Sequence, residues 1–243
     1  GAKKDKIFNV SVMPCAAKLY ESTRDKHMNA SGVQDYDMVL TTRELAQLIR
    51  EAGIDFNNLP EGQADSFMGA YTGAGTIFGA TGGVMEAALR TAYHSLAGKE
   101  LGPVEYMPAR GLKDVKVAEV NIKGTKIRIA VVHQLGNVDQ VVQKVREELA
   151  AGKSVDELSF HFIEVMACRG GCVAGGGQPY GATDEIRKLR AAALYKDDKD
   201  CKIRQSHNNP EIKAIYKDFL GTPGSEKAEK YLHTAYDELD MYR

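Results

Sequence analysis

The stretch "EVMACRGGCVAGGGQP", residues 164–179, joins a predicted strand to a pair of cysteines and a run of glycines. The apolar residues at 160–167 predict a buried strand that leads directly into Cys168. Cys172 follows four residues later, a spacing that can place both sulfurs on one face of a helical turn. Glycines let the backbone approach a neighbour closely, at a cost in chain entropy that needs a reason. The stretch therefore predicts a strand that ends at a sulfur-containing ligand site.

Three kinds of site are compatible with these two cysteines. They can be a pair of buried thiols without any ligand, which is the ordinary state of cysteine in a core. They can hold an anionic iron–sulfur centre, because backbone N–H groups of glycines directed at its sulfides would offset its charge. They can bind zinc, but zinc takes four tetrahedral ligands, and the sequence has no second CxxC and no HxxxH. The glycines favour the iron–sulfur centre, and the residues alone leave all three alternatives open.

Helix and strand signals alternate along the rest of the chain. Strands are predicted at 7–12, 160–167 and, as a pair joined at Lys123-Gly124, within 115–133. Helices are predicted at 41–53, with a capping box of Thr41 and Glu44, at 82–98, at 137–152, capped by Asn137, at 184–195, capped by Thr183, at 210–220 and at 225–236. This order predicts an α/β fold with a partly parallel sheet flanked by helices, and short C-terminal helices that wrap it.

Two cysteines follow predicted strand ends in such a fold. Pro14-Cys15 comes after the strand at 7–12, and Ala167-Cys168 comes after the strand at 160–167. Ligands in α/β folds gather beyond the C-terminal ends of strands. We therefore expect Cys15 to converge with Cys168 and Cys172, although about 150 residues separate them in the sequence.

Composition excludes several classes of function. The 243 residues are 43% apolar and carry a net charge of −1, so no basic surplus favours nucleic acid or anionic lipid. No stretch approaches the length of a membrane span, and the start, "GAKKDKIFNV", lacks the apolar core of a signal peptide. Four cysteines without such a signal argue against a disulfide framework and predict a reducing, cytoplasmic environment.

Two further stretches bear on the ligand. In "VMPCAAKLYES", residues 12–22, Lys18 lies three positions beyond Cys15, so it can share the sulfur's side of a helix and offer a cation; otherwise it is a solvated surface lysine. The stretch "TGAGTIFGATGG", residues 72–83, reads G-x-G-x-x-x-G, follows no strand and lacks a Gly-Lys-Ser/Thr ending. It therefore does not predict a nucleotide site and instead favours close backbone packing around a cofactor.

Together, "VMPCAAKLYES", "TGAGTIFGATGGVMEAALRTAY" and "EVMACRGGCVAGGGQP" closely resemble motifs of the iron-only (FeFe) hydrogenases. The tail "SHNNPEIKAIYKDFLGTPGSEKAEKYLHTAY" resembles the small-subunit-like segment of that family, and the resemblance runs from about residue 7 to residue 236. It implies an H-cluster domain at 1–200, followed by a small-subunit-like helical tail at 201–243.

The resemblance implies an H-cluster, a 4Fe–4S cubane joined through a cysteine sulfur to a two-iron unit with CO, cyanide and a dithiolate. By resemblance, Cys15, Cys168 and Cys172 are cubane ligands, and Cys172 bridges to the two-iron unit. Lys18 would hydrogen-bond a cyanide. The remaining positions implied at the site are Met13, Met166 and Phe78 against the two-iron unit, and Gly175, Gly176, Gly177 and Gln178 at the cofactor.

The first motif of the family, a T-S-C-C-P-like stretch, is not in the sequence, and it supplies the fourth cubane ligand and a proton-relaying cysteine. Cys201 lies in a charged stretch outside the ligand motifs, and none of the six histidines is assigned to catalysis. The resemblance therefore implies the C-terminal part of a hydrogenase domain, which we expect to be inactive alone, poorly loaded with cluster and self-associated through the face left by the missing lobe.

The resemblance also implies partners. They are a ferredoxin or another iron–sulfur electron carrier, and the maturation proteins that insert the cluster. The main alternative is a hydrogenase-like sensory or iron–sulfur assembly protein that makes no hydrogen. A second alternative, a structural zinc protein, would give a colourless, zinc-loaded sample.

Overall fold

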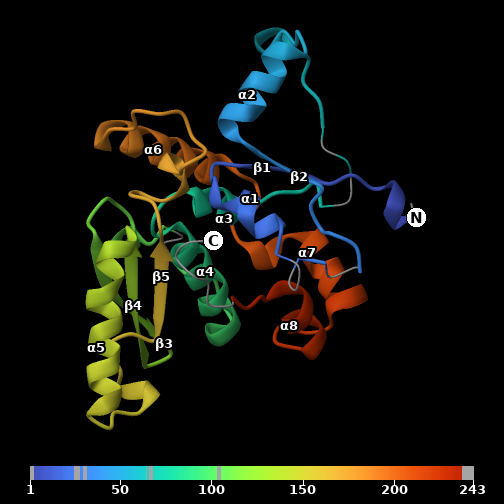
Figure 1. Cartoon of the computed structure of the whole chain (residues 1–243). Coiled ribbons are helices and arrows are strands. Elements are labelled where there is room, and N and C mark those ends of the chain that lie inside the picture. The colour runs from blue at the N-terminus through green and yellow to red at the C-terminus, as the bar shows by residue number, and fades with distance from the viewer. Residues whose placement is uncertain are drawn as a thin grey trace. The chain divides into compact units, whose positions relative to one another are not determined.

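The computed structural model describes residues 3–24, 28–29, 32–63, 65, 68–102 and 105–236 (Figure 1). His27, one of the six histidines, lies outside these residues. The chain divides into two compact units, Gln63–Asn209 and the pair of segments Gly1–Gly62 and Pro210–Arg243. Among the described residues, none of the helices has the length and apolar character needed to cross a membrane.

The larger unit is built on a three-stranded mixed sheet in the order β3-β4-β5. Strands β3 (Val115–Ile122) and β4 (Thr125–His133) form the predicted antiparallel hairpin, in which Lys123 and Gly124 make the turn with positive φ angles. Strand β5 (Phe162–Met166) pairs with β4 in parallel, so that His133 lies opposite Met166. Both strands therefore deliver their C-terminal ends to the same edge of the sheet, where Cys168 follows.

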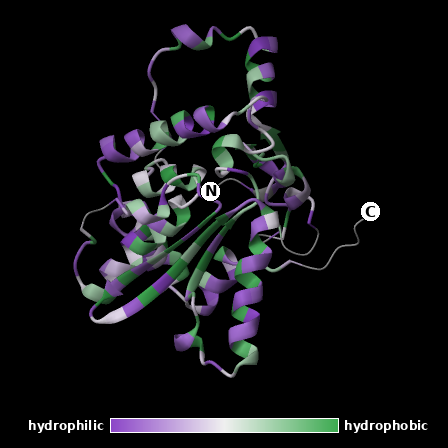
Figure 2. Cartoon of the chain, turned by 90° about the vertical axis from the view of Figure 1, so that its left-hand side faces the viewer, coloured by the Kyte–Doolittle hydropathy of each residue, from purple (hydrophilic) through white to green (hydrophobic). Residues whose placement is uncertain are grey.

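Helices cover both faces of this sheet (Figure 1). Helix α4 (Gly83–Ala97) packs on one face, and α5 (Val138–Ala150), which connects β4 to β5, packs on the other. The core on the α4 side consists of Met85, Leu89, Ala109, Val120, Ile122, Ile129 and Val131. The core on the α5 side consists of Ala130, Val132, Val141 and Phe160. Successive residues of β4 thus alternate between the two cores, as the pleat of a strand requires, and apolar residues are prominent along these strands in Figure 2.

A buried ion cluster joins α4 to α6 (Asp184–Asp200). The Arg90 guanidinium donates to both Asp198 carboxylate oxygens at 2.8 Å and to Glu86 Oε1 at 2.7 Å. The Arg90 side chain is 1% exposed and the two carboxylates are 0% exposed. Burial alone would raise the pKa of Asp198, but its hydrogen bonds to Arg90 and Arg204 hold that pKa below the ordinary value.

The smaller unit contains a second, two-stranded sheet. Strand β1 (Val10–Met13) pairs in parallel with β2 (Met38–Thr41), so that Val10 lies opposite Met38. Its helices are α1 (Ala17–Ser22), α2 (Thr42–Glu51), α7 (Pro210–Ile215), which continues as a π-helical segment (Tyr216–Leu220), and α8 (Glu226–Leu232).

Most predicted elements are confirmed, with shifted ends. The capping box of Thr41 and Glu44 and the cap at Thr183 are both formed. Within the part of the chain that the structure describes, the five strands fall into two sheets, one parallel and one mixed, so the partly parallel α/β prediction holds. The helix at 225–236 ends earlier, at Leu232.

One local prediction was wrong. Asn137 does not cap α5, because its backbone is already helical and its side-chain amide donates to the His133 carbonyl oxygen at 2.8 Å. The helix predicted at 210–220 is confirmed, and its last turn, Tyr216–Leu220, widens to π geometry before Gly221.

Candidate metal centre

Cys168 and Cys172 lie in a tight loop at the C-terminal end of β5. Cys168 comes two residues after the strand, and Cys172 begins a single 3₁₀ turn, Cys172–Ala174. Neither forms a disulfide, and both are half-buried. The loop closes on itself through the Gly171 N–H, which donates to the Cys168 carbonyl oxygen at 3.0 Å. Both sulfurs are therefore presented from one short, closed segment.

Gly171 fixes this loop against the second glycine-rich stretch. Its φ of 93° and ψ of −161° lie in a region that only glycine adopts readily. A Cβ at this position would lie 2.7 Å from the Thr81 backbone nitrogen and 3.0 Å from the Gly79 carbonyl oxygen. The Thr81 N–H also donates to the Gly170 carbonyl oxygen at 3.0 Å. Backbone therefore packs directly on backbone here, and the two glycine-rich stretches of the sequence meet.

Arg169, between the two cysteines, ties the loop to three neighbouring segments. Its Nε and Nη2 donate to the two Asp184 carboxylate oxygens at 2.9 and 2.7 Å, a bidentate pair. Its Nη1 donates to Asp114 Oδ1 at 3.0 Å and to Gln134 Oε1 at 3.1 Å. The hydrogen bond and charge of Arg169 hold the pKa of the Asp184 carboxyl well below its usual range. The fixed charge thus anchors the loop to the start of α6 and to the ends of two strands.

His133 contacts the backbone of the loop through its buried imidazole. Its side chain is 0% exposed, its Nδ1 accepts the Gly170 N–H at 3.1 Å, and its Nε2 lies 3.3 Å from the Leu112 carbonyl oxygen. These partners suit a neutral imidazole with the proton on Nε2. Burial lowers the pKa of His133 and so favours that neutral form. A neutral ring here is a rigid support for the loop.

Glu164 connects β5 to the start of α4. Its carboxylate accepts the backbone N–H groups of Gly82 at 2.6 Å and Met85 at 2.7 Å. Burial raises the pKa of Glu164 in spite of these bonds. Burial also lowers the pKa of the neighbouring Lys116 to about 8, although the charge of Glu164 opposes that shift. The two groups lie in an interior that disfavours both charges.

The other predicted ligand region lies in the smaller unit. Cys15, a half-buried free thiol, comes two residues after β1, and Lys18 lies in α1. The Lys18 ammonium pairs with the Glu21 carboxylate. Partial burial alone would lower the pKa of Lys18, but the contact with Glu21 outweighs it and raises that pKa. Met13 and Lys18 line a cavity of about 50 Å³ in that unit. The convergence of Cys15, Met13 and Lys18 with Cys168 and Cys172 stays a prediction.

The remaining predicted site residues belong to the larger unit. Met166 ends β5, and its carbonyl oxygen accepts the Gln134 N–H at 2.9 Å. Phe78 lies in the turn Ile77–Gly79 and its side chain is 46% exposed. Gly175 and Gly177 are buried, Gly176 is exposed and Gln178 is half-buried. The Gly175 N–H donates to the Cys172 carbonyl oxygen at 3.0 Å, and Gln178 N–H donates to Gly175 at 2.9 Å. The roles of these residues toward a cofactor stay predictions.

Cys201 lies on a different element from the cysteine loop. It forms the C-cap of α6, where its N–H donates to the Asp197 carbonyl oxygen at 2.9 Å. Its thiol lies near the Tyr71 hydroxyl, and that hydrogen bond raises the pKa of Tyr71. Its assignment as a cysteine outside the ligand set stays a prediction.

Sequence reasoning missed the residues that hold the loop. Arg169 and His133 make its supporting contacts, and Glu164 joins β5 to the start of α4. The Arg190 guanidinium adds a hydrogen bond to the Val173 carbonyl oxygen at 2.8 Å. Two of them carried a visible signal. Arg169 stands between the cysteines, and Glu164 is a charge inside the otherwise apolar strand "FIEVM".

The donor set of the loop suits an iron–sulfur centre. Thiolates are the ligands that such clusters take, and Cys168 and Cys172 are half-buried cysteines, outside any disulfide, at the end of a strand. The N–H groups of Gly170, Gly171 and Gly175, however, already donate to protein acceptors. These glycines therefore serve close backbone packing within the loop and are less suited to offsetting the charge of a cluster.

Comparison with known families and proteins extends these observations. The family described as "Iron only hydrogenase large subunit, C-terminal domain" matches residues 1–176. The family described as "Iron hydrogenase small subunit" matches residues 184–238. The NADP-reducing hydrogenase subunit HndD of Solidesulfovibrio fructosivorans is 46% identical over 237 residues, which are 97% of this chain and 39% of that protein.

Two other comparisons show the range of the similarity. Cytosolic iron-sulfur assembly component 3 of Mus musculus is 30% identical over 243 aligned residues, covering 97% of this chain and 48% of that protein. The structure of an apo variant of the FeFe-hydrogenase HydA1 from Chlamydomonas reinhardtii superposes with a TM-score of 0.73 at 36% identity, covering 96% of this chain and 63% of that one. The chain thus spans two fifths to one half of the length of these curated relatives.

Proposed function

Because the chain belongs to the family of iron-only hydrogenase large subunits, we propose that it forms part of a catalytic domain for the reversible reduction of protons to hydrogen. The observation that carries this proposal is the loop at 168–172. It presents two half-buried cysteines, which form no disulfide, from a segment that Gly171 and Arg169 fix in place. Such a loop suits a bulky cluster ligated by thiolates.

The residues that would hold the H-cluster are Cys15, Cys168 and Cys172 as cubane ligands, with Cys172 bridging to the two-iron unit. When bound, the cluster would pass the carrier's electrons to protons at its two-iron unit. Lys18 would donate a charge-assisted hydrogen bond to an anionic ligand of the cluster, in place of its contact with Glu21. The thioethers of Met13 and Met166 would supply soft, polarizable packing.

The protein's own part is to orient these ligands. Arg169 and His133 hold the backbone between the thiolates, so that both sulfurs leave the loop from fixed positions. Ligands held in this way by outer contacts keep their geometry when the metal changes its charge. Electrons would come from a ferredoxin or a similar iron–sulfur carrier, and maturation proteins would insert the cluster, in a cytoplasmic setting.

The ligand assignment is tested by single cysteine substitutions. We would reconstitute the 243-residue chain anaerobically with iron and sulfide and measure iron per chain for Cys15→Ser, Cys168→Ser and Cys172→Ser. Each substitution should lower the iron content, whereas the control Cys201→Ser should retain it. Equal retention by Cys15→Ser and Cys201→Ser would remove Cys15 from the ligand set.

Activity of the chain by itself is a separate test. A cubane takes four thiolates, and the motif cysteines of this chain provide three. We therefore expect the 243-residue chain, expressed with the maturation machinery and given a low-potential donor, to evolve no hydrogen and to associate with itself. Turnover like that of a full-length relative would contradict this expectation and point to Cys201 as a fourth ligand.

The similarity to an iron–sulfur assembly component favours a second candidate, a cluster-binding protein that makes no hydrogen. Infrared spectroscopy separates the two, because only a protein that accepts the two-iron unit gains CO and cyanide bands after maturation. A cubane signal without such bands in the complete parent protein would support the assembly role.

A further inference from the structure

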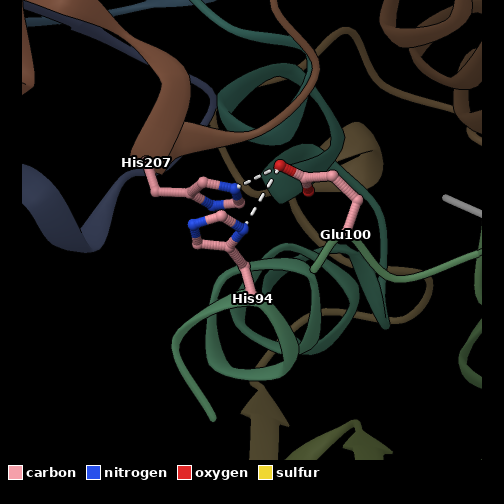
Figure 3. Close-up of side chains that lie close together, drawn as sticks. All are labelled: His94, Glu100 and His207. Atoms are coloured by element: carbon pink, nitrogen blue, oxygen red, sulfur yellow. Dashed lines mark hydrogen bonds and ion pairs between the residues drawn. The ribbon is translucent and has the colours of Figure 1, made fainter. Parts of the chain in front are cut away.

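Three potential metal ligands meet at the C-terminal end of α4, outside the cysteine loop. His94 lies in the last turn of the helix, Glu100 follows its Gly98 cap, and His207 comes from the 3₁₀ turn Ser206–Asn208. Figure 3 shows the three side chains turned toward one another, with both imidazoles directed at one carboxylate. All three belong to the larger unit.

The donor atoms are spaced as the ligands of one small cation would be. Glu100 Oε1 lies 3.1 Å from His207 Nε2 and 3.4 Å from His94 Nδ1. Two ligands on a tetrahedral zinc ion with bonds of about 2.0–2.1 Å are separated by roughly 3.3–3.4 Å. One ligand atom from each of the three side chains lies within 4.8 Å of the others. A small rotation of one imidazole is therefore enough to bring all three donors into reach of one ion.

Both rings are held in a way that a simple ion pair does not need. The two imidazoles stack with their centroids 4.2 Å apart and 15° between their planes. His94 Nδ1 is buried and makes no well-aligned hydrogen bond, although the Glu100 carboxylate lies 3.4 Å away. A metal ion between the three side chains would give this nitrogen a partner and would displace the proton shared by His207 and Glu100.

A second layer of contacts orients the donors. Thr91 Oγ1 lies 3.1 Å from His207 Nδ1, so an Nδ1 proton given to Thr91 leaves the Nε2 lone pair for a metal. The Asn208 amide donates to Glu100 Oε1 at 3.2 Å. Metal-binding histidines in proteins commonly have such a partner on the other ring nitrogen, which fixes the ring and the tautomer.

We propose that His94, Glu100 and His207 form a zinc-binding site, separate from the cysteine centre, that fastens the turn at 206–208 to the end of α4. Two imidazoles and one carboxylate are a ligand set that zinc uses when a fourth position stays open to water. The side chains of His94 and Glu100 are 41% and 44% exposed, so that position faces solvent. The nitrogen and oxygen donors distinguish this site from the thiolates of the cysteine loop.

The test is calorimetric titration of Zn²⁺ into the folded 243-residue chain after its thiols have been blocked with iodoacetamide. Blocking removes the cysteines as competing ligands. The variants are His94→Gln, Glu100→Gln and His207→Gln. The matched control is His233→Gln, because His233 lies 3.7 Å from Glu229 in an exposed histidine–glutamate pair that lacks a second imidazole. Mg²⁺, which prefers oxygen ligands, serves as the control ion.

We expect one equivalent of Zn²⁺ to bind the unsubstituted chain and no heat of binding with Mg²⁺. Each of the three variants should weaken Zn²⁺ binding at least tenfold, and His233→Gln should leave it unchanged. Thr91→Val, which removes only the outer contact, should weaken it by about 10–100-fold. Glu100 is exposed, so Glu100→Gln remains folded and informative even where a histidine variant does not. Zn²⁺ binding that is absent in the unsubstituted chain, or equally strong in Glu100→Gln, would overturn the proposal.

Discussion

Replacing Gly171 by alanine should dislodge the cysteine loop while leaving both cysteines in place. The new Cβ would lie 2.7 Å from the Thr81 backbone nitrogen, roughly 0.7 Å closer than an ordinary van der Waals contact allows. The Gly79 carbonyl oxygen, 3.0 Å from the new Cβ, is also a backbone atom, so no side-chain rotation relieves the overlap. The loop must therefore move away from the turn at Thr81, which breaks the hydrogen bond from Thr81 N–H to the Gly170 carbonyl.

The stability that Gly171→Ala should lose has two parts. Alanine at a φ of 93° and a ψ of −161° is strained by about 1–3 kcal/mol. The steric overlap adds about 1–3 kcal/mol, as overpacking does elsewhere in proteins. Gly181→Ala is the matched control, because Gly181 has a φ of 77° but would have no atom within 4 Å of an added Cβ. That variant should lose only about 1–2 kcal/mol of stability through its backbone.

The assay is urea-induced unfolding of the two variants, followed by circular dichroism, with iron per chain measured after anaerobic reconstitution. We expect Gly171→Ala to have a lower free energy of unfolding than Gly181→Ala by at least 1 kcal/mol, the smaller estimate of the overlap. We also expect it alone to lose iron. Equal free energies of unfolding and equal iron contents would refute the argument that close backbone packing holds the loop.

Three other substitutions follow from the structure. Lys116 has a folded-state pKa of about 8, below its unfolded value, so the stability of the wild-type chain rises as pH increases from 8 to 10.5. Lys116→Met lacks this gain, so its free energy of unfolding minus that of wild type, measured by urea unfolding, should fall by about 3 kcal/mol over that window. A constant difference would contradict the assigned burial of Lys116. Arg90→Met removes the cation that Glu86 and Asp198 share, although Arg110 and Arg204 still pair with them, and should cost about 3–5 kcal/mol of stability. The exposed control Lys126→Met should cost less than about 1 kcal/mol, and similar losses in the two variants would show that the cluster is dispensable. Lys18→Ala in the complete parent enzyme should leave fold and cubane intact and weaken the infrared bands of CO and cyanide; unchanged bands and hydrogen evolution would make Lys18 a surface lysine.

Short-range signals predicted the elements correctly. The capping box of Thr41 and Glu44 and the cap at Thr183 act within three residues, and the turn at Lys123-Gly124 needs only a positive φ. Whether such caps and turns form depends mainly on neighbouring residues, so they can be predicted from the local sequence. Asn137 shows where this fails, because its side-chain Nδ2 donates to a carbonyl four residues back and its side chain makes no capping bond to the helix.

The cysteine loop was only half visible in the sequence. The thiols and glycines could be recognised, since their type and spacing carry the chemistry. The contacts that hold them could not, because Arg169 reaches Asp184 and Asp114, which lie 15 and 55 residues away, and His133 lies 37 residues from Gly170. No periodic pattern encodes such pairs, and they depend on which strands become neighbours.

The buried cluster around Arg90 bears on how this family divides its chains. Arg90 and Glu86 lie in the segment that matches a large subunit, and Asp198 lies in the segment that matches a small subunit. The division between the two segments, at 177–183, is therefore a division of the polypeptide and not of the folded interior. If this chain were cut there, Arg90 would keep Glu86 but lose its hydrogen bonds to Asp198, and Asp198 would keep Arg204 but lose Arg90. Each piece would then expose charged groups that the other covers in the intact chain, so the two pieces would be expected to associate as they fold.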